Sequence, residues 1–129
     1  MALRRLVLDM SVLVAGLRSR LGAGNRVLEL VAGRRLTPMV TTALFLEYED
    51  VLNRPEQRLA TGMSEDDVTE FMAAFASAAE PVEVHFLWRP QLTDPADELV
   101  LEAAVNGKAQ AIVTHNVRNF LSAARLFGI

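Results

Sequence analysis

Apolar and polar positions follow two different periods along the chain. Short apolar runs, such as LVL at 6–8 and AIV at 111–113, are typical of buried strands, whereas other stretches repeat apolar residues at the spacing of amphipathic helices. The pattern predicts strands at 3–8, 36–41, 82–88 and 111–114, and helices at 11–17, 25–32, 42–53, 64–79, 95–105 and 119–126. Because strands and helices alternate, we predict an α/β protein with a mostly parallel sheet covered on both faces.

Asp9 lies in the middle of the most apolar stretch of the chain, LVLDMSVLV. An ionised carboxylate buried there without a partner is costly, so Asp9 is expected to cap a helix, bind a ligand or point into a cleft. It follows the first predicted strand, and Thr114 and Asn116 follow the last one. Ligands of open α/β sheets bind outside the carboxyl ends of the strands, which makes these residues candidates for one site.

Other carboxylates are predicted near the same edge of the sheet. Asp94 and Asp97 begin the helix that precedes the last strand, and Glu47 belongs to the helix after the second strand. A simpler role competes with metal binding at two of them. A helix N-cap fits Asp9 equally well and, taken alone, fits Asp94 better, with Asp97 then favouring the helix dipole. Glu47 and Glu49 flank the apolar face of their helix at similar angles, so periodicity does not choose between them.

A cluster of carboxylates has a clear chemical use. Neighbouring carboxylates repel each other and raise each other's pKa unless a cation offsets them. Mg²⁺ and Mn²⁺ are hard cations that take one or two carboxylates together with water. Such an ion can orient water and stabilise the charge that develops when a phosphodiester is attacked. The sequence therefore predicts a candidate Mg²⁺ or Mn²⁺ site.

Composition narrows the class of protein. The chain has 129 residues, 51% of them apolar, which predicts one globular domain, and the lack of cysteine excludes disulfides, zinc–thiolate sites and thiol catalysis. The first apolar run is too short for a signal peptide or a membrane span, so we expect a cytoplasmic protein. The net charge of −3 argues against a broad basic surface but permits a local basic rim. The candidates for that rim are Arg18, Arg20 and Arg118.

Three segments resemble, in the same order, the motifs of PIN-domain proteins, in particular the VapC-like ribonucleases that act as toxins of bacterial toxin–antitoxin systems. VLDMSVLVAGL is similar to the opening strand of the family with its Asp-Thr-Asn/Ser signature. TTALFLEYEDVL is similar to the segment that carries the family's glutamate, which falls on Glu47. LTDPADELVLEAAVNGKAQAIVTHNVRNF is similar to the closing motif and places the third acid on Asp97 and the strand-end threonine on Thr114.

The resemblance implies a three-layer α/β/α sandwich, formed by a single PIN-like domain over 1–129 that lacks the usual last strand. It also implies Mg²⁺- or Mn²⁺-assisted hydrolysis of RNA, a homodimer, and a cognate antitoxin protein as partner, with no membrane involved. The residues that it assigns are the catalytic acids Asp9, Glu47 and Asp97, the metal ligands Asp9, Asp97 and Asn116, and the supporting residues Ser11, Asp94, Thr114 and Asn119.

The chain departs from the family pattern at three positions. Met10 stands where the family usually has threonine, and Ser11 substitutes in part for the missing hydroxyl. The two candidate positions for a fourth acid hold Asn116 and Asn119, which are neutral, so we expect weak metal affinity and weak cleavage. The alternative is a degenerate PIN module that binds RNA or a protein partner without cutting. A receiver-like signalling domain fits less well, because the only lysine, Lys108, precedes the last strand rather than following it.

Overall fold

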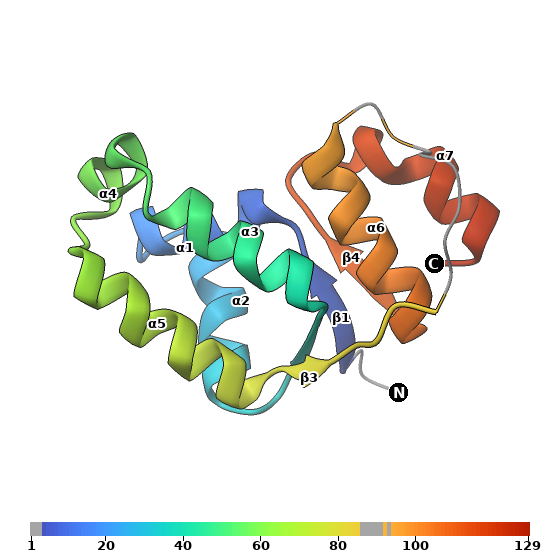
Figure 1. Cartoon of the computed structure of the whole chain (residues 1–129), viewed down its shortest axis with the longest axis horizontal. Helices are drawn as coiled ribbons and strands as arrows, with labels where there is room; N and C mark the ends of the chain where they lie inside the picture. The colour runs from blue at the N-terminus through green and yellow to red at the C-terminus, as the bar shows by residue number, and fades with distance from the viewer. Residues whose placement is uncertain (1–3, 86–91, 93) are drawn as a thin grey trace.

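The computed structural model describes residues 4–85, 92 and 94–129, and a parallel β-sheet runs through it (Figure 1). Its four strands lie in the order β3-β2-β1-β4 and are all parallel. Leu6 of β1 pairs with Pro38 of β2 on one side and with Ala111 of β4 on the other. The strand order therefore reverses at β1, the position where α/β sheets hold their ligands. The strands are β1 (Arg5–Leu8), β2 (Thr37–Val40), β3 (Glu80–Pro81) and β4 (Ala111–Val113).

Helices cover both faces of this sheet. Leu6, Val7 and Leu8 of β1 are all buried, although successive side chains of a strand point to opposite faces. Helix α6 contacts β1, β2 and β4, and α3 contacts α5 and α6. The predicted α/β/α sandwich with its parallel sheet is thus confirmed. In the described part of the chain the helices are α1 (Met10–Arg18), α2 (Ala23–Ala32), α3 (Thr42–Leu52), α4 (Pro55–Thr61), α5 (Glu65–Ala78), α6 (Pro95–Gly107) and α7 (Val117–Phe127).

Helices α1 and α2 pack closely because glycines form the contact between them. A Cβ atom added at Gly24 would lie 2.8 Å from the carbonyl oxygen of Val12 and 2.9 Å from the amide nitrogen of Gly16. The side chain of Asn25 also donates a hydrogen bond to the Gly16 carbonyl at 2.9 Å. This contact holds the helix that follows Asp9 in place.

Helix caps anchor two of the helices as the sequence predicts. The Ser64 hydroxyl accepts a hydrogen bond from the Asp67 amide at 3.1 Å, and the Asp67 carboxylate accepts one from the Ser64 amide at 2.9 Å. These bonds from Ser64 hold the pKa of Asp67 below its ordinary value, because they favour the ionised carboxylate. Asp94 caps α6 by accepting a hydrogen bond from the Ala96 amide at 2.9 Å. The N-cap interpretation of Asp94 is therefore confirmed.

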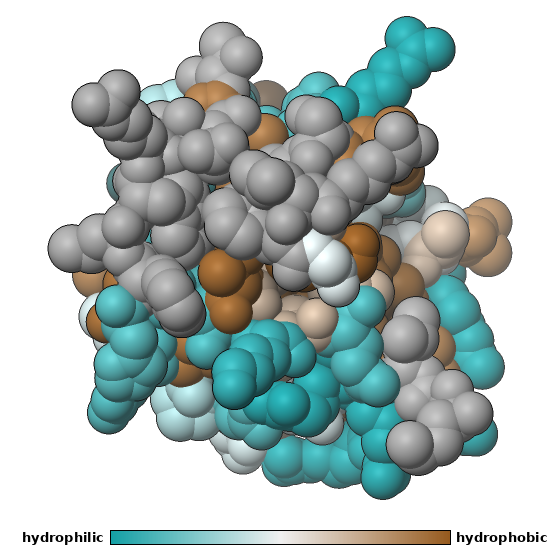
Figure 2. All heavy atoms as spheres, turned by 90° about the vertical axis from the view of Figure 1, so that its right-hand side faces the viewer, coloured by the Kyte–Doolittle hydropathy of each residue, from teal (hydrophilic) through white to brown (hydrophobic). Residues whose placement is uncertain are grey.

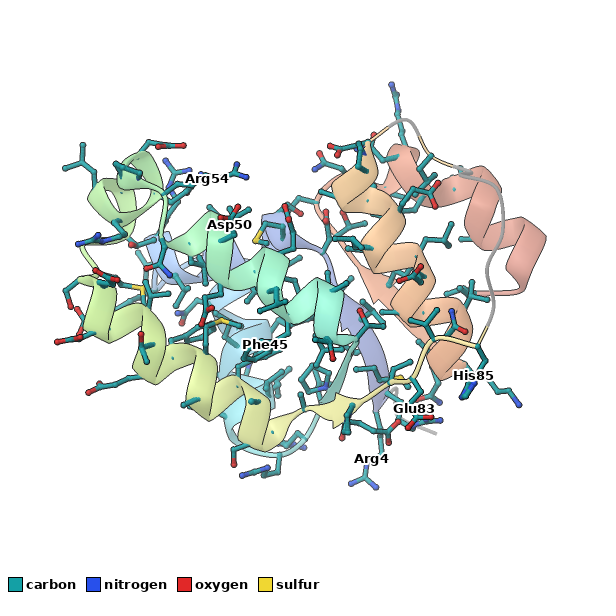
Figure 3. All side chains as sticks on the ribbon, viewed as in Figure 1. Arg4, Phe45, Asp50, Arg54, Glu83 and His85 are labelled. Carbon is teal, nitrogen blue, oxygen red and sulfur yellow. The ribbon has the colours of Figure 1, made fainter. Side chains whose placement is uncertain are left out.

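Two elements differ from the sequence prediction. Helix α4 is not predicted, because Pro55 ends the preceding helical stretch; the same proline lies in the first turn of α4, where its fixed φ is tolerated. The predicted strand at 82–88 is wrong in its described part, since β3 ends at Pro81. Glu83 and His85 are exposed beyond it (Figure 3), so the alternation reflects a solvated connection. Residues 86–88 lie outside the described residues.

The surface carries apolar side chains next to polar ones. On the side of α6 and α7, brown apolar atoms lie between teal polar atoms (Figure 2), and Val117 and Leu121 of α7 are exposed. Within the described ranges, no helix is both long enough and apolar enough to cross a lipid bilayer.

Candidate active site

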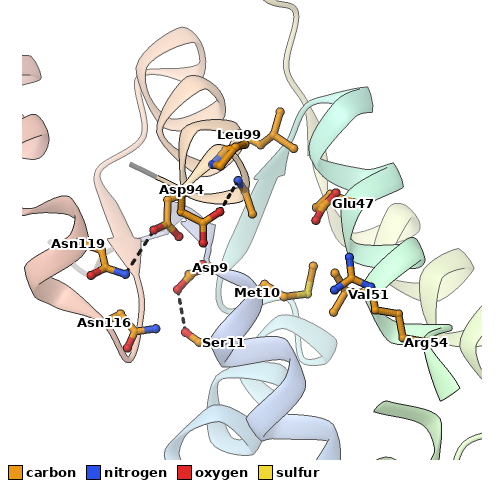
Figure 4. Close-up of a pocket in the computed structure, with 13 residues that line it drawn as sticks. Asp9, Met10, Ser11, Glu47, Val51, Arg54, Asp94, Leu99, Asn116 and Asn119 are labelled. Atoms are coloured by element: carbon orange, nitrogen blue, oxygen red, sulfur yellow. Dashed lines mark hydrogen bonds between the residues drawn. The ribbon is translucent and has the colours of Figure 1, made fainter. Parts of the chain in front are cut away.

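A cavity of about 650 Å³ opens beyond the carboxyl end of β1 (Figure 4). Its walls come from the start of α1, the second half of α3, the start of α6, and the start of α7. The cavity therefore lies where the strand order reverses. Thirteen described residues line it: Asp9, Met10, Ser11, Glu47, Val51, Arg54, Asp94, Pro95, Ala96, Asp97, Leu99, Asn116 and Asn119.

Asp9 is held by side chains from both ends of the chain. It is 5% exposed and occupies the N-cap position of α1, but its side chain makes no capping hydrogen bond. Its Oδ2 atom instead accepts hydrogen bonds from the hydroxyls of Ser11 at 2.8 Å and Thr114 at 2.7 Å. The capping interpretation of Asp9 is therefore wrong: the neighbouring hydroxyls satisfy the carboxylate.

The two hydroxyls are themselves fixed by the backbone. Ser11 Oγ accepts a hydrogen bond from the His115 amide at 3.2 Å, and Thr114 Oγ1 accepts one from the Asn116 amide at 2.9 Å. Each hydroxyl carries a single proton, so these bonds direct both protons to Asp9. Ser11 and Thr114 thus set the orientation of Asp9, and its Oδ1 atom takes no part in these two bonds.

Asp97 lies on the first turn of α6 and lines the same cavity as Asp9. It is 9% exposed, and its Oδ2 atom accepts a hydrogen bond from the Asn119 amide group at 3.3 Å. Burial raises the pKa of Asp97, and the charges of Asp9 and Asp94 raise it further, whereas Asn119 lowers it. Negative charge is therefore in excess at this end of the cavity, and a bound cation would relieve it.

Glu47 lines the same cavity from α3 (Figure 4). Glu49, the alternative that helical periodicity leaves open, does not line it. Among the described residues, no group of three His, Asp or Glu side chains is arranged to hold a metal ion. The structure thus brings Asp9 and Asp97 together and places Glu47 on another wall. Two carboxylates with hard oxygen atoms fit Mg²⁺ or Mn²⁺, which keep several water ligands in protein sites.

The remaining sequence candidates separate into two groups. Asn116, Asn119, Asp94 and Ser11 line the cavity, and Thr114 reaches it through its bond to Asp9. Arg18, Arg20 and Arg118 are exposed, and none of them lines it. One arginine does line the cavity, Arg54, and it is not among the three basic residues predicted from the sequence. Arg54 lies beyond the end of α3, at the N-cap of α4, so the helical periodicity of α3 does not place it and no sequence motif marks it.

Tyr48 supports the strand end from which Asp9 projects. Its ring is fully buried and packs edge-on against Phe75 with the centroids 5.6 Å apart, and its hydroxyl donates a hydrogen bond to the Leu8 carbonyl. Burial raises the pKa of Tyr48 and the nearby charge of Asp9 adds to the rise, so the hydroxyl stays protonated and remains a donor. The sequence indicated only that Tyr48 lies on the apolar face of its helix.

We predict that Tyr48→Phe lowers the free energy of unfolding by about 1–3 kcal/mol, because the buried Leu8 carbonyl loses its side-chain donor while the ring contacts remain. Urea denaturation at pH 7 measures the change. A difference below about 0.3 kcal/mol would show that this hydrogen bond is not part of the native structure.

A family model described as PIN domain matches residues 5–118. Neither the curated proteins nor the solved structures contain a match to the chain.

Proposed function

Because the chain belongs to the PIN-domain family, whose members are generally nucleases that use divalent metals, we propose that it is a Mg²⁺- or Mn²⁺-dependent endoribonuclease. The observation that carries the proposal is that Asp9 and Asp97 line one cavity at the point where the strand order reverses. Nothing in the packing of the core needs two carboxylates there, and their mutual repulsion is a cost that a bound cation would offset.

In this proposal Asp9 and Asp97 hold the ion, and Asn116 adds a neutral oxygen. A bound Mg²⁺ or Mn²⁺ would supply charge stabilisation at the phosphodiester and a more acidic water. Ser11 and Thr114 keep the Asp9 carboxylate oriented, as their hydrogen bonds to Oδ2 support. Glu47, on the facing wall, is the carboxylate left to orient or deprotonate the attacking water.

We further propose that the protein acts as the toxin of a bacterial toxin–antitoxin pair, as a cytoplasmic homodimer restrained by a cognate antitoxin. Support for this part comes from the order of the three sequence motifs and from the cavity that the same motifs line.

Purified protein incubated with labelled single-stranded RNA is expected to cleave it internally in the presence of Mn²⁺ or Mg²⁺ and to stop when EDTA is added, because the carboxylates alone provide no positive charge for the developing phosphorane. Gel analysis of the products measures this. Cleavage that persists unchanged in EDTA would contradict the metal-dependent mechanism.

A second candidate is a PIN module that binds RNA or a protein partner with little or no cleavage. The neutral Asn119, which donates to Asp97 where an acid would add charge, favours it. Calorimetric titration with Mn²⁺ separates the two candidates. Binding at millimolar or lower concentration, lost in Asp97→Asn, supports the nuclease; no measurable binding in the wild type supports the non-cleaving module.

A further inference from the structure

Arg54 brings a positive charge to a cavity that is otherwise acidic. Among the thirteen described lining residues it is the one basic side chain, and the carboxylates of Asp9, Glu47, Asp94 and Asp97 line the same cavity. A polyanion that enters this cavity meets repulsion at the acidic end unless a cation is bound there. At the other end it meets the Arg54 guanidinium, a group with the geometry to bind phosphate oxygens in pairs.

The backbone of Arg54 is fixed. Pro55 restricts the residue before it to extended conformations, and Arg54 has φ −62° and ψ 139°. The Arg54 amide donates to the Val51 carbonyl at 3.1 Å, and the Arg54 carbonyl accepts hydrogen bonds from the amides of Gln57 at 3.0 Å and Arg58 at 2.9 Å. The side chain therefore starts from a defined point on the cavity wall, which lowers the entropy lost when it binds a ligand.

The guanidinium is available for exchange with a ligand. Its ion pair with Asp50 at 3.3 Å joins two side chains that are 50% and 67% exposed (Figure 3). Exposed pairs of this kind contribute little to stability. A phosphate at the cavity can replace Asp50 at small cost.

The surface between the two ends of the cavity suits an extended chain. Met10 and Val51 lie between Asp9 and Arg54 (Figure 4). None of the thirteen described lining residues is aromatic, so the cavity lacks the stacking surfaces on which proteins hold single-stranded bases. Contacts to the sugar–phosphate backbone are what these walls offer.

We propose that Arg54 binds a backbone phosphate of single-stranded RNA whose scissile bond lies beside Asp9 and Asp97. The assignment of the RNA and of the scissile bond rests on the proposed function. Arg54 then fixes the direction in which the strand crosses the cavity: over Met10 and Val51 and toward the α3–α4 junction. The three exposed arginines predicted from the sequence have no such position.

Equilibrium binding tests the proposal without depending on cleavage. The parent protein carries Glu47→Gln, which leaves both proposed metal ligands, Asp9 and Asp97, in place and, in the proposed function, blocks turnover. Binding of a short fluorescent single-stranded RNA is measured by anisotropy in Mn²⁺ at several salt concentrations, with Arg54→Ala, Arg54→Lys or Arg26→Ala added. Arg26 is the matched control: it forms a similarly exposed ion pair with Glu29 at 3.2 Å, on α2, and does not line the cavity.

Arg54→Ala is expected to weaken binding about tenfold and to reduce the slope of log K against log salt by about 0.7, the value of one lost phosphate contact to a single strand. Arg54→Lys is expected to keep the salt dependence and lose part of the affinity. Lysine keeps the positive charge but cannot form the paired hydrogen bonds of a guanidinium to phosphate. Arg26→Ala is expected to bind like the parent.

The proposal is overturned if Arg54→Ala binds within twofold of the parent, if Arg26→Ala weakens binding as much, or if the parent does not bind RNA. Cleavage by the wild type separates this result from the proposed function. If the wild type cleaves RNA but binding does not depend on Arg54, only the role of Arg54 is wrong. If binding depends on Arg54 but the wild type does not cleave RNA, only the nuclease activity is wrong.

Discussion

Replacing Asp97 by Asn is expected to lower kcat/KM for metal-dependent RNA cleavage by about a hundredfold or more while the metal-free protein remains folded. Substituting a residue that only orients a metal ligand already lowers metal affinity or activity about 10- to 100-fold, and Asp97 is proposed as a ligand itself. Asn keeps the shape of the side chain and can still accept the hydrogen bond from Asn119. Glu49→Gln is the matched control, because Glu49 lies on α3 outside the cavity. Cleavage retained by Asp97→Asn, or an equal loss in Glu49→Gln, would remove Asp97 from the site.

The same variant is expected to be more stable than the wild type in EDTA at pH 7. The pKa of Asp97 is raised in the folded protein above its ordinary value of 3.8, so the native state disfavours the ionised form. The favourable contribution of Asp97 is present below pH 3.8 and is lost as the pH rises through the raised pKa. At neutral pH the ionised Asp97 therefore destabilises the wild type, and the neutral Asn of the variant does not. The difference in the free energy of unfolding between the two proteins shrinks as the pH falls toward 3.8. Urea denaturation between pH 3.8 and pH 7 measures this difference at each pH. A variant that is less stable than the wild type at pH 7 would contradict the electrostatic account.

Gly24→Ala is expected to lower the free energy of unfolding by about 3 kcal/mol. The new Cβ would meet backbone atoms, the Val12 carbonyl oxygen at 2.8 Å and the Gly16 amide nitrogen at 2.9 Å, which cannot rotate away as a side chain can. Helix propensity alone favours Ala over Gly by about 1 kcal/mol. A lower free energy of unfolding in this variant would therefore result from the steric clash and not from helix propensity.

Gly33→Ala is the control on the same helix. Gly33 follows the last turn of α2 with φ −78°, and a Cβ there would have its nearest contact at 3.4 Å, an ordinary distance. We expect a change within about 0.5 kcal/mol for this variant. Chemical denaturation compares the two, and an equal or higher stability of Gly24→Ala would show that α1 and α2 do not pack as closely as described.

The sequence predicts the parts of the fold that repeat over several residues. Buried strands and amphipathic helices leave a periodic pattern, and their alternation is enough for a parallel sheet with helices on both faces. Errors arise where a short signal has two meanings. Pro55 both ends one helix and opens the next, and the alternation after Pro81 belongs to an exposed connection.

The candidate site is predictable only in part, because its contacts join distant segments. The ends of the first and last strands mark Asp9 and Thr114 as candidates for one site, but not the hydrogen bond that joins the two side chains across 105 residues. Helical angles alone leave Glu47 and Glu49 equivalent, and the packing of α3 against the rest of the molecule places Glu47 on the cavity wall. Arg54 carries no motif and is found only when the cavity is seen.

A Mn²⁺ complex examined by anomalous diffraction tests the central claim most directly. The account predicts a Mn²⁺ peak within bonding distance of carboxylate oxygens from both Asp9 and Asp97, about 2.2 Å for such ligands, and the loss of that peak in Asp97→Asn. Mn²⁺ bound elsewhere on the surface at millimolar concentration, with nothing between these two side chains, would contradict it.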